Sequence, residues 1–427
     1  MEEWKEYKLG DIVKLTIDYR GKTPLKLGGA WSTSGYRALS AKNIKTGHIV
    51  NQESIRFVDE DLYKKWMKDE VQRGDILITS EAPFGQVYYW NSDEKIVLSQ
   101  RLFCLRLSED VCPKYVYYYM TTGAFQFELD GRATGTTVMG LRQPELLKCK
   151  IQIPSLAIQQ QIAKILSSFD DKIEVNRRIN ENLEQQAQAL FKSWFVDFEP
   201  FKDGEFVESE LGMIPKQLLI EKISNIPHVL ETGRRPKGGV GDNTHGIPSV
   251  GAEHIKGMGN YDYSKTKYIS EEYAKSLKTG RINGYELLIY KDGGKPGYFI
   301  PNYSIFGEGY PFDECYLNEH VFKLDFDDRG FNAFCYFYFR TDYVMNYLNA
   351  QGGKAAIPGI NRQDVENIQI FSPDNDLVKK YGEKVLPMIT KMLINCKESR
   401  RLATLRDTLL PRLMSGELTI NDIGDSL

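Results

Sequence analysis

The chain has 427 residues, which is too many for one ordinary domain and favours two to four folded units. Hydrophobic residues make up 41% of it and charged residues 26%, which excludes a disordered or a fibrous protein. The formal net charge of −3 neither indicates nor excludes nucleic-acid binding, because acidic residues elsewhere can cancel a local basic face.

Apolar runs and cysteines indicate where such a protein works. No run approaches the roughly 18 apolar residues that span a membrane, and the first residues, Met-Glu-Glu-Trp-Lys, lack the apolar core of a signal peptide. The 6 cysteines are scattered and form no C-x-x-C pair. We therefore expect a cytoplasmic protein with reduced thiols and no membrane partner.

The sequence repeats itself over most of its length. A single spacing (373 − 154 = 219) relates these pairs: Pro154 and Pro373, Gly140-Leu141 and Gly359-Ile360, Phe103 and Phe322, Tyr117 and Tyr336. Further upstream a spacing of 252 − 41 = 211 relates Ala41 to Ala252 and Ile44 to Ile255. A register kept over tens of residues indicates an internal duplication.

The first part of each copy has the pattern of a mixed α/β domain. Short apolar runs such as Ile76-Leu77-Ile78 are bounded by turn-forming residues and predict strands. A helical stretch is expected over Pro113–Leu129 in the first copy and over Asn332–Leu348 in the second. The pattern does not fix the order of the strands.

The second part of each copy predicts a long helix. Apolar residues recur there at alternating steps of four and three, which is the seam of a coiled coil. The first seam is Ile162, Leu166, Phe169, Ile173, Asn176, Asn180, Leu183, Ala187, Leu190 and Trp194. The second is Tyr381, Val385, Met388, Met392, Asn395, Ser399, Leu402, Arg406, Leu409 and Leu413. Pro387 interrupts the second seam, so we expect a kink or a late helix start there. Two unrelated surface helices are the alternative, which the shared register disfavours.

Connectivity determines how these helices can pack. The first leaves one domain and delivers the chain to the next, so a second helix packed on it must run back. We therefore expect an antiparallel pair with an approximate two-fold axis and a domain at each end. Asn176 and Asn395 fall near the helix centres and should meet close to that axis, where buried amides could fix the register at a cost in stability.

Motifs of DNA-modifying or nucleotide-using enzymes are missing. There is no Pro-Pro pair for a base-gripping methyltransferase loop, and Gly21-Lys22-Thr23 lacks the first glycine of a phosphate-binding loop because Thr16 stands there. The 5 histidines show no paired ligand spacing. We expect no catalytic residue, no metal and no cofactor in this chain.

Basic and polar residues gather instead in glycine-rich loops at comparable places of the two copies. Such residues suit contacts with phosphates and base edges. The candidates in the first copy are Arg20, Lys22, Lys42, Asn43, Arg132, Thr134, Thr136 and Arg142. Those in the second copy are Arg234, Arg235, Lys237, His254, Lys354 and Arg362. Any one of them could equally be a solvated surface residue, but the duplication of the loops favours a function. Glu253-His254 stands where the first copy has Lys42-Asn43, as expected if the copies read different bases.

Four segments of the chain are distinctive: Trp4-Lys5-Glu6-Tyr7-Lys8-Leu9-Gly10-Asp11, Ile153-Pro154-Ser155-Leu156 leading into Gln159-Gln160-Gln161-Ile162, Ala189–Phe195 and Leu409–Leu418. They give the chain a resemblance to the specificity subunit of type I restriction–modification systems. It implies target-recognition domains at 1–155 and, with a linker, at 199–373. It also implies conserved helices at 156–198 and 374–420. One departure stands after Pro215, where Lys216-Gln217 replaces the Gly-Trp that the family tends to have.

The resemblance also implies a function. Each recognition domain would read half of a split site in double-stranded DNA, and the helices would set the gap and dock two modification subunits. Those subunits would carry S-adenosylmethionine and methylate adenine, and restriction/translocase subunits would cut unmodified DNA. The alternatives are a fused restriction–methylation enzyme, whose segments are missing, and a coiled-coil interaction scaffold without DNA specificity. A gel shift with partner subunits would distinguish the scaffold.

Overall fold

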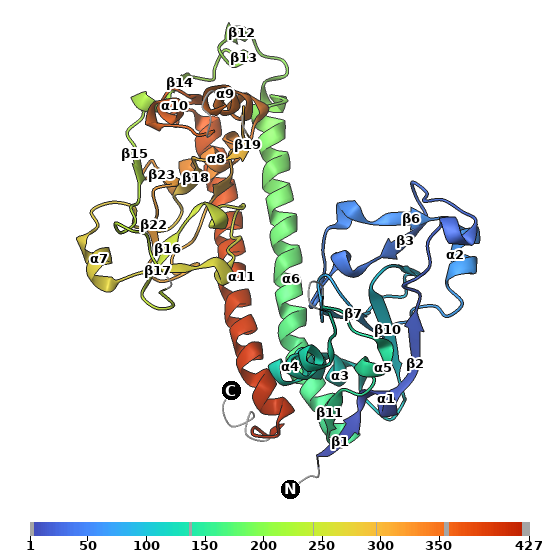
Figure 1. The fold of residues 1–427 in the computed structure, drawn as a ribbon. Helices are drawn as coiled ribbons and strands as arrows, with labels where there is room; N and C mark the ends of the chain where they lie inside the picture. The colour runs from blue at the N-terminus through green and yellow to red at the C-terminus, as the bar shows by residue number, and fades with distance from the viewer. Residues whose placement is uncertain (1–3, 136–138, 242, 296, 354–357, 421–427) are drawn as a thin grey trace. The chain divides into compact units, whose positions relative to one another are not determined.

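The computed structural model describes residues 4–135, 139–241, 243–295, 297–353 and 358–420 (Figure 1). The chain divides into two compact units, one of residues 1–171 with 402–427 and the other of residues 172–401. Both divisions fall inside long helices, so each unit contains a part of each helix. No helix of the described residues is both long enough and apolar enough to cross a membrane. All six cysteines are free thiols.

A four-stranded antiparallel sheet forms the centre of the first unit. In sheet order its strands are β2 (Val13–Asp18), β10 (Leu102–Leu107), β7 (Ile76–Thr79) and β8 (Val87–Tyr89). Successive side chains of a strand point to opposite faces. Ile76, Ile78 and Phe103 therefore enter one hydrophobic core, whereas Leu77 and Cys104 enter another. Burial on both faces explains why the β7 sequence is a continuous apolar run rather than an alternating one.

The second core of the first unit lies under a smaller sheet of β6 (Arg56–Val58), β3 (Tyr36–Leu39) and β9 (Val97–Leu98). Helix α2 (Glu60–Trp66) begins at Asp59, whose carboxylate accepts a hydrogen bond from the Leu62 amide. Trp66 at its end is fully buried, and its indole donates to the Leu98 carbonyl. The remaining strands here are β4 (Ile44–Lys45) and β5 (His48–Ile49), a short hairpin.

Helices follow the sheets and lead back to the start of the chain. In chain order they are α3 (Pro113–Met120), α4 (Gly123–Arg132) and α5 (Gln143–Leu146). The expected single helix over Pro113–Leu129 is thus two, because the Thr122 hydroxyl accepts from the Phe125 amide and starts a new helix. Strand β11 (Lys150–Ile153) then pairs with β1 (Lys5–Lys8), which is followed by α1 (Leu9–Ile12).

The second unit repeats the two sheets of the first unit in the same strand order. Its larger sheet is β15 (Val229–Thr232), β23 (Val321–Asp325), β18 (Leu287–Tyr290) and β21 (Tyr303–Ser304), and its smaller one is β17 (Lys267–Ile269), β16 (Ile247–Val250) and β22 (Tyr316–Leu317). Strand β14 (Ile220–Lys222) pairs with β24 (Gln369–Phe371) as β1 pairs with β11. The two copies share one strand order, as a duplicated domain requires.

The other elements of the second unit also have their counterparts, with two small hairpins added. They are α7 (Glu271–Ser276), α8 (Arg329–Tyr338), α9 (Asp342–Gly352), α10 (Arg362–Glu366), β12 (Phe206–Ser209), β13 (Gly212–Pro215), β19 (Gly294–Lys295) and β20 (Tyr298–Phe299). The expected helix Asn332–Leu348 is likewise divided in two, at Thr341, the residue before α9. The departure after Pro215 leads directly into β14, and Leu219 there is held by hydrogen bonds to the Asn375 amide group.

Two long antiparallel helices run through both units, α6 (Leu156–Phe195) and α11 (Asp376–Met414). In the first unit, Ile162 and Leu166 share a hydrophobic core with Leu413, and Arg406 is tolerated in the seam because it pairs with Asp170. The expected late start at Pro387 is wrong, since α11 begins at Asp376 and continues through that proline. The predicted fold class, a mixed α/β domain built twice with a long antiparallel helix pair, is confirmed.

The predicted helix-pair core residues lie on the facing sides of α6 and α11. Fully buried are Ile162, Leu166, Asn176, Met392 and Asn395, and half-buried are Phe169, Ile173, Leu183, Leu190, Met388, Leu402 and Leu409. The sequence pattern did not indicate that residues beside the seam, such as Phe191 and Ile389, are buried as well. Both belong to the hydrophobic core of the domain, and the Phe191 ring also contacts Tyr381 of the seam, so each helix has a wider apolar face than a two-helix coiled coil.

A buried polar layer crosses the helix pair in the second unit. The Asn176 amide nitrogen donates to the Glu398 carboxylate at 2.8 Å and to the Ser399 hydroxyl at 3.3 Å, and lies 3.5 Å from the Asn395 carbonyl. The Asn395 amide donates to the Asn180 carbonyl oxygen at 2.8 Å. Asn180 and Ser399 occupy equivalent positions in the two copies of the seam. Asn176 donates to Ser399 and Asn395 donates to Asn180, so the internal repeat relates the two contacts. The side-chain oxygens of both central asparagines are buried and have no hydrogen-bond partner among the described residues.

Candidate nucleic-acid interface

Backbone hydrogen bonds gather the polar loops of the first unit at one end of its larger sheet. The Ser80 amide donates to the Arg101 carbonyl, and the Leu141 amide donates to the Ser80 carbonyl. The Ala41 amide donates to the carbonyl of Gln100, which brings a further loop to the same place. We call loops 18–22, 40–43, 80–82, 99–101 and 139–142 the first loop cluster.

Arg20 and Lys22 are held by neighbours within this cluster. The Arg20 guanidinium makes two 2.8 Å hydrogen bonds to the Asp18 carboxylate and stacks over the Phe103 ring at 4.0 Å. The Lys22 ammonium donates to the Trp66 carbonyl and lies over the Tyr19 ring, and partial burial lowers its pKa. Arg20 and Lys22 therefore stabilise the loop that would contact a ligand. The Asp18 carboxylate balances the charge of Arg20.

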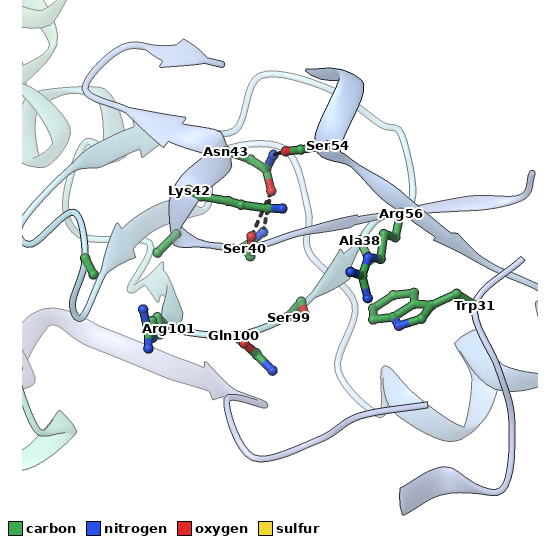
Figure 2. A pocket seen from close by; sticks show the side chains of 12 residues that line it. Trp31, Ala38, Ser40, Lys42, Asn43, Ser54, Arg56, Ser99, Gln100 and Arg101 are labelled. Atoms are coloured by element: carbon green, nitrogen blue, oxygen red, sulfur yellow. Dashed lines mark hydrogen bonds between the residues drawn. The ribbon is translucent and has the colours of Figure 1, made fainter. Parts of the chain in front are cut away.

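A cavity of about 360 Å³ opens beside these loops and is lined with exposed cations. Figure 2 shows Arg56 beside the Trp31 ring on one side and Gln100 with Arg101 on the other, with Lys42 also at the cavity. The Arg56 guanidinium lies 5.2 Å from the centre of the Trp31 ring. The Arg101 guanidinium lies 3.7 Å from the Glu81 carboxylate, and Lys42 has no ion-pair partner among the described residues. We call this the first-unit cavity.

Asn43, which was expected to contact DNA, is buried and uses its side chain for hydrogen bonds within the protein. Its side chain is 1% exposed. Its carbonyl oxygen accepts from the Ser40 amide and hydroxyl, and its amide nitrogen donates to the Asn51 carbonyl and the Ser54 hydroxyl. The residue closes the turn that presents Lys42, as Figure 2 shows, and no donor or acceptor of it is left for a base.

His254 has the corresponding place in the second unit. Its imidazole is 0% exposed, stacks on Tyr261 at 4.4 Å and accepts a hydrogen bond at Nδ1 from the Gly251 amide. Burial lowers its pKa, so the ring is neutral, and its Nε2 has no hydrogen-bond partner among the described residues. His254, like Asn43, is a buried residue that stabilises the turn.

The remaining predictions of the first unit fall on one loop. Arg132 ends α4 and donates to Glu128 on the same helix, with Glu145 3.7 Å away. Thr134 is exposed in a backbone bridge with Gly140, and Arg142 is exposed at the start of α5 without an ion pair to a described residue. Thr136 lies outside the described residues. Arg142 is thus available to a ligand, whereas the charge of Arg132 is balanced.

The second unit builds an equivalent cluster with the same backbone bonds. The Lys291 amide donates to the His320 carbonyl, and the Ile360 amide donates to the Lys291 carbonyl, as Ser80, Arg101 and Leu141 do in the first unit. We call loops 233–237, 251–254, 291–293, 318–320 and 358–362 the second loop cluster.

The predicted residues of the second unit belong to this cluster. Arg235 pairs with Glu319 at 2.5 Å, and Arg362 donates to the Leu230 carbonyl and lies 3.3 Å from Glu366. Arg234 and Lys237 are exposed, with no ion-pair partner among the described residues. Lys354 lies outside the described residues. Arg234 and Lys237 are therefore the free cations of the second cluster.

The sequence reasoning overlooked Trp31, Arg56, Gln100 and Arg101, which line the first-unit cavity. Arg101 lies in a run that reads as a strand, but its φ of 63° interrupts the extended backbone and exposes its side chain. One signal could have found Gln100 and Arg101. In the register that pairs Phe103 with Phe322 they stand opposite Glu319 and His320, a change of charge at an otherwise matched position.

Comparison with known proteins shows which proteins this chain is similar to. Residues 1–185 match the family described as the type I restriction modification DNA specificity domain. The specificity subunit of the type I restriction enzyme MjaIX of Methanocaldococcus jannaschii is 29% identical over 430 residues, which cover 99% of this chain and 95% of that protein. The specificity subunit of HindI of Haemophilus influenzae is 25% identical over 480 residues, 98% of this chain and 100% of that protein.

A solved structure shares the fold. It is the crystal structure of the S subunit of a type I restriction-modification system from M. genitalium, with a TM-score of 0.57 over 96% of each chain. Its sequence identity to this chain is 16%, so the likeness is one of architecture. The duplicated domains and long helices are thus a known arrangement.

Proposed function

We propose that this chain, which belongs to the family of type I restriction–modification specificity subunits, reads the two halves of a split DNA site with its two loop clusters. The observation that carries the proposal is the repeated cluster itself. The same backbone hydrogen bonds bring equivalent loops together in both units, and each cluster exposes basic residues. A duplicated reader matches a site with two halves.

The first-unit cavity supplies both kinds of contact that DNA recognition needs. Lys42, Arg56 and Arg101 can attract phosphates, and their donors also fit the acceptor atoms of base edges. The Trp31 ring and the Gln100 amide add an aromatic face and a group that both donates and accepts. Because Lys42 and Arg142 lack an ion-pair partner among the described residues, binding DNA breaks no internal pair at these two positions.

The long helices suit the other tasks of such a subunit. We propose that α6 and α11 hold the two readers apart and dock two modification subunits in the cytoplasm. Those subunits would bind S-adenosylmethionine and transfer the methyl group, and restriction/translocase subunits would join them. This chain itself would contribute no catalytic step. The lack of methyltransferase and nuclease motifs in its sequence supports this division of labour.

Lys42→Ala tests the proposal in the complex with modification subunits. We expect weaker DNA binding and, if Lys42 meets a phosphate, a salt dependence of log K reduced by about one unit of slope. Lys14→Ala is the matched control, because Lys14 is also an exposed lysine, lies near the end of β2 away from the cluster and pairs with Glu109. Equal affinities of the two variants would contradict the proposed interface. A wild-type complex that binds all sequences alike would instead indicate an interaction scaffold.

A further inference from the structure

The two loop clusters can be compared position by position. In the first unit the Ser99 amide donates to the Leu39 carbonyl, and in the second the Asn318 amide donates to the Val250 carbonyl. The turns that follow β3 and β16 are closed alike, by Asn43 on the Ser40 amide and by His254 on the Gly251 amide, both at 3.1 Å. The backbone therefore presents the second residue of each turn, Lys42 or Glu253, in the same way.

The neighbouring positions match too, and only some of them change charge. Arg101 pairs with Glu81 at 3.7 Å in the first unit, and His320 pairs with Asp292 at 2.8 Å in the second. Gln100 corresponds to Glu319, and Arg56 corresponds to Lys267 in the same strand register. The first turn thus offers the Lys42 ammonium among other cations. The second offers the Glu253 carboxylate, and the neighbouring Glu319 carboxylate is paired with Arg235.

The Glu253 carboxylate lies close to Gly251 in the second turn. A Cβ atom on Gly251 would lie 2.4 Å from Glu253 Oε2 and 2.7 Å from the Asn318 amide nitrogen. Gly251 has a φ of −109°, which any residue adopts, so a side chain there would displace the Glu253 carboxylate rather than strain the backbone. The first unit has Ser40 there. Glu253 is part-exposed, and its only ion-pair neighbour among the described residues is Lys267 Nζ at 3.9 Å.

A carboxylate in a DNA-reading loop has few useful partners. Phosphates repel it, so it weakens contact with the backbone of any sequence. It gains only where a base offers a hydrogen, and the exocyclic amino group of cytosine is the group that Glu and Asp accept from in the major groove. Adenine offers an amino group beside the N7 acceptor, which also repels a carboxylate. An ammonium has the opposite preference and fits guanine O6 and N7.

We infer that the two units read bases of opposite hydrogen-bond polarity, with Lys42 selecting a guanine in one half-site and Glu253 selecting a cytosine in the other. The inference rests on the proposed function and assigns a base class to equivalent positions of the two clusters. The turn has the same backbone structure in both units, and the charge of its second residue determines which base it prefers.

Selection from a randomised DNA library tests the inference, with the complete complex of this chain and its modification subunits. The variants are Lys42→Gln and Glu253→Gln, which keep side-chain length and remove charge. Their controls are Lys14→Gln and Glu272→Gln, exposed residues outside the clusters. Each variant's melting temperature is compared with that of the wild type to verify folding.

The expected result is a loss of selectivity at one position per variant. Glu253→Gln should reduce the preference for one cytosine by roughly 5- to 150-fold and leave the other half-site unchanged. Lys42→Gln should likewise reduce the preference for one guanine in the opposite half-site. An unchanged set of selected sequences with uniformly lower affinity would assign Lys42 to a phosphate and overturn its part, and an unchanged set for Glu253→Gln would overturn the other. If the wild-type complex selected no split site, the proposed function would fail before these variants are compared.

Discussion

Asn43 and His254 show one structural task performed by two different side chains. Each lies buried at the end of a short 3-10 turn and accepts a hydrogen bond from a backbone amide three residues earlier. Leaving that buried amide without an acceptor would cost about 1–3 kcal/mol. The amide of Asn43 is saturated by the loop at Asn51 and Ser54, whereas His254 relies on stacking against Tyr261. The second copy thus has an ionisable group where the first has none.

The titration of His254 leads to a pH prediction. Its pKa is lowered from the ordinary 6.5, chiefly by burial, with Glu253 and Asp262 opposing the shift and Lys256 adding to it. Between 6.5 and the lowered value, the unfolded chain binds a proton that the folded chain does not. The free energy of unfolding should therefore decrease as the pH falls through that window.

His254→Asn, which copies the first unit, should remove this part of the pH dependence. Urea unfolding of wild type and variant at pH 7.5 and 5.5 measures it. We expect the wild type to lose more stability than the variant on acidification, and an identical loss in both would contradict a buried neutral imidazole.

At the scale of the elements, the helix pair combines an apolar seam with a costly polar layer. Asn176 and Asn395 are 1% and 0% exposed, and within the part of the chain that the structure describes neither side-chain oxygen has a hydrogen-bond partner. An unsatisfied buried acceptor costs about 1–3 kcal/mol. Their amide nitrogens nevertheless find defined partners across the seam, which favours one register over a shifted one. The polar layer therefore lowers the stability of the helix pair and favours one alignment of the two helices over others.

Replacing both asparagines with leucine should raise the melting temperature. Leucine has a similar volume, and the substitution removes both unsatisfied oxygens, so we expect a gain of about 1–4 kcal/mol. Glu398 is part-exposed and can be hydrated when its donor is lost. Leu183→Ala is the reference for a simple loss of seam packing and should lower the melting temperature. A destabilised double-leucine variant would show that the amides stabilise the pair rather than align it.

At the scale of the whole molecule, the proposed helix spacer can be tested by length. The division between the compact units falls after Asp171 in α6 and after Arg401 in α11. A seven-residue insertion at both places keeps the seam in phase and adds roughly 10 Å of helix at 1.5 Å per residue. At about 3.4 Å per base pair, the tolerated gap between half-sites should grow by roughly three base pairs.

Mapping of methylated adenines in cells that express the lengthened chain with its modification subunit would reveal the new gap. A five-residue insertion at both places is the control, because at 3.6 residues per turn it rotates the seam by about 140° and should abolish modification. Methylation at the original spacing by the seven-residue variant would mean that the helices do not set the distance.

Periodicity and repetition were enough to predict much of this protein. The 219-residue register identified the duplication, and the four-three steps located the seam of both long helices, because such patterns reflect which face of an element is buried. The two polar seam positions, Asn176 and Asn395, followed from the same pattern. The positions of the basic loops followed from composition and from their recurrence.

The roles of single loop residues depended on the tertiary structure. Asn43 looks like a base reader in the sequence, but residues 51–54 accept from its side-chain nitrogen and Ser40 donates to its side-chain oxygen. Arg20 and Arg132 look like free cations, yet acidic neighbours balance both. Arg101 reads as part of a strand and lies at the cavity because its backbone turns out of the sheet. A sequence determines which groups are present and which face of each element is buried, whereas the availability of a polar group depends on partners that only long-range folding brings together.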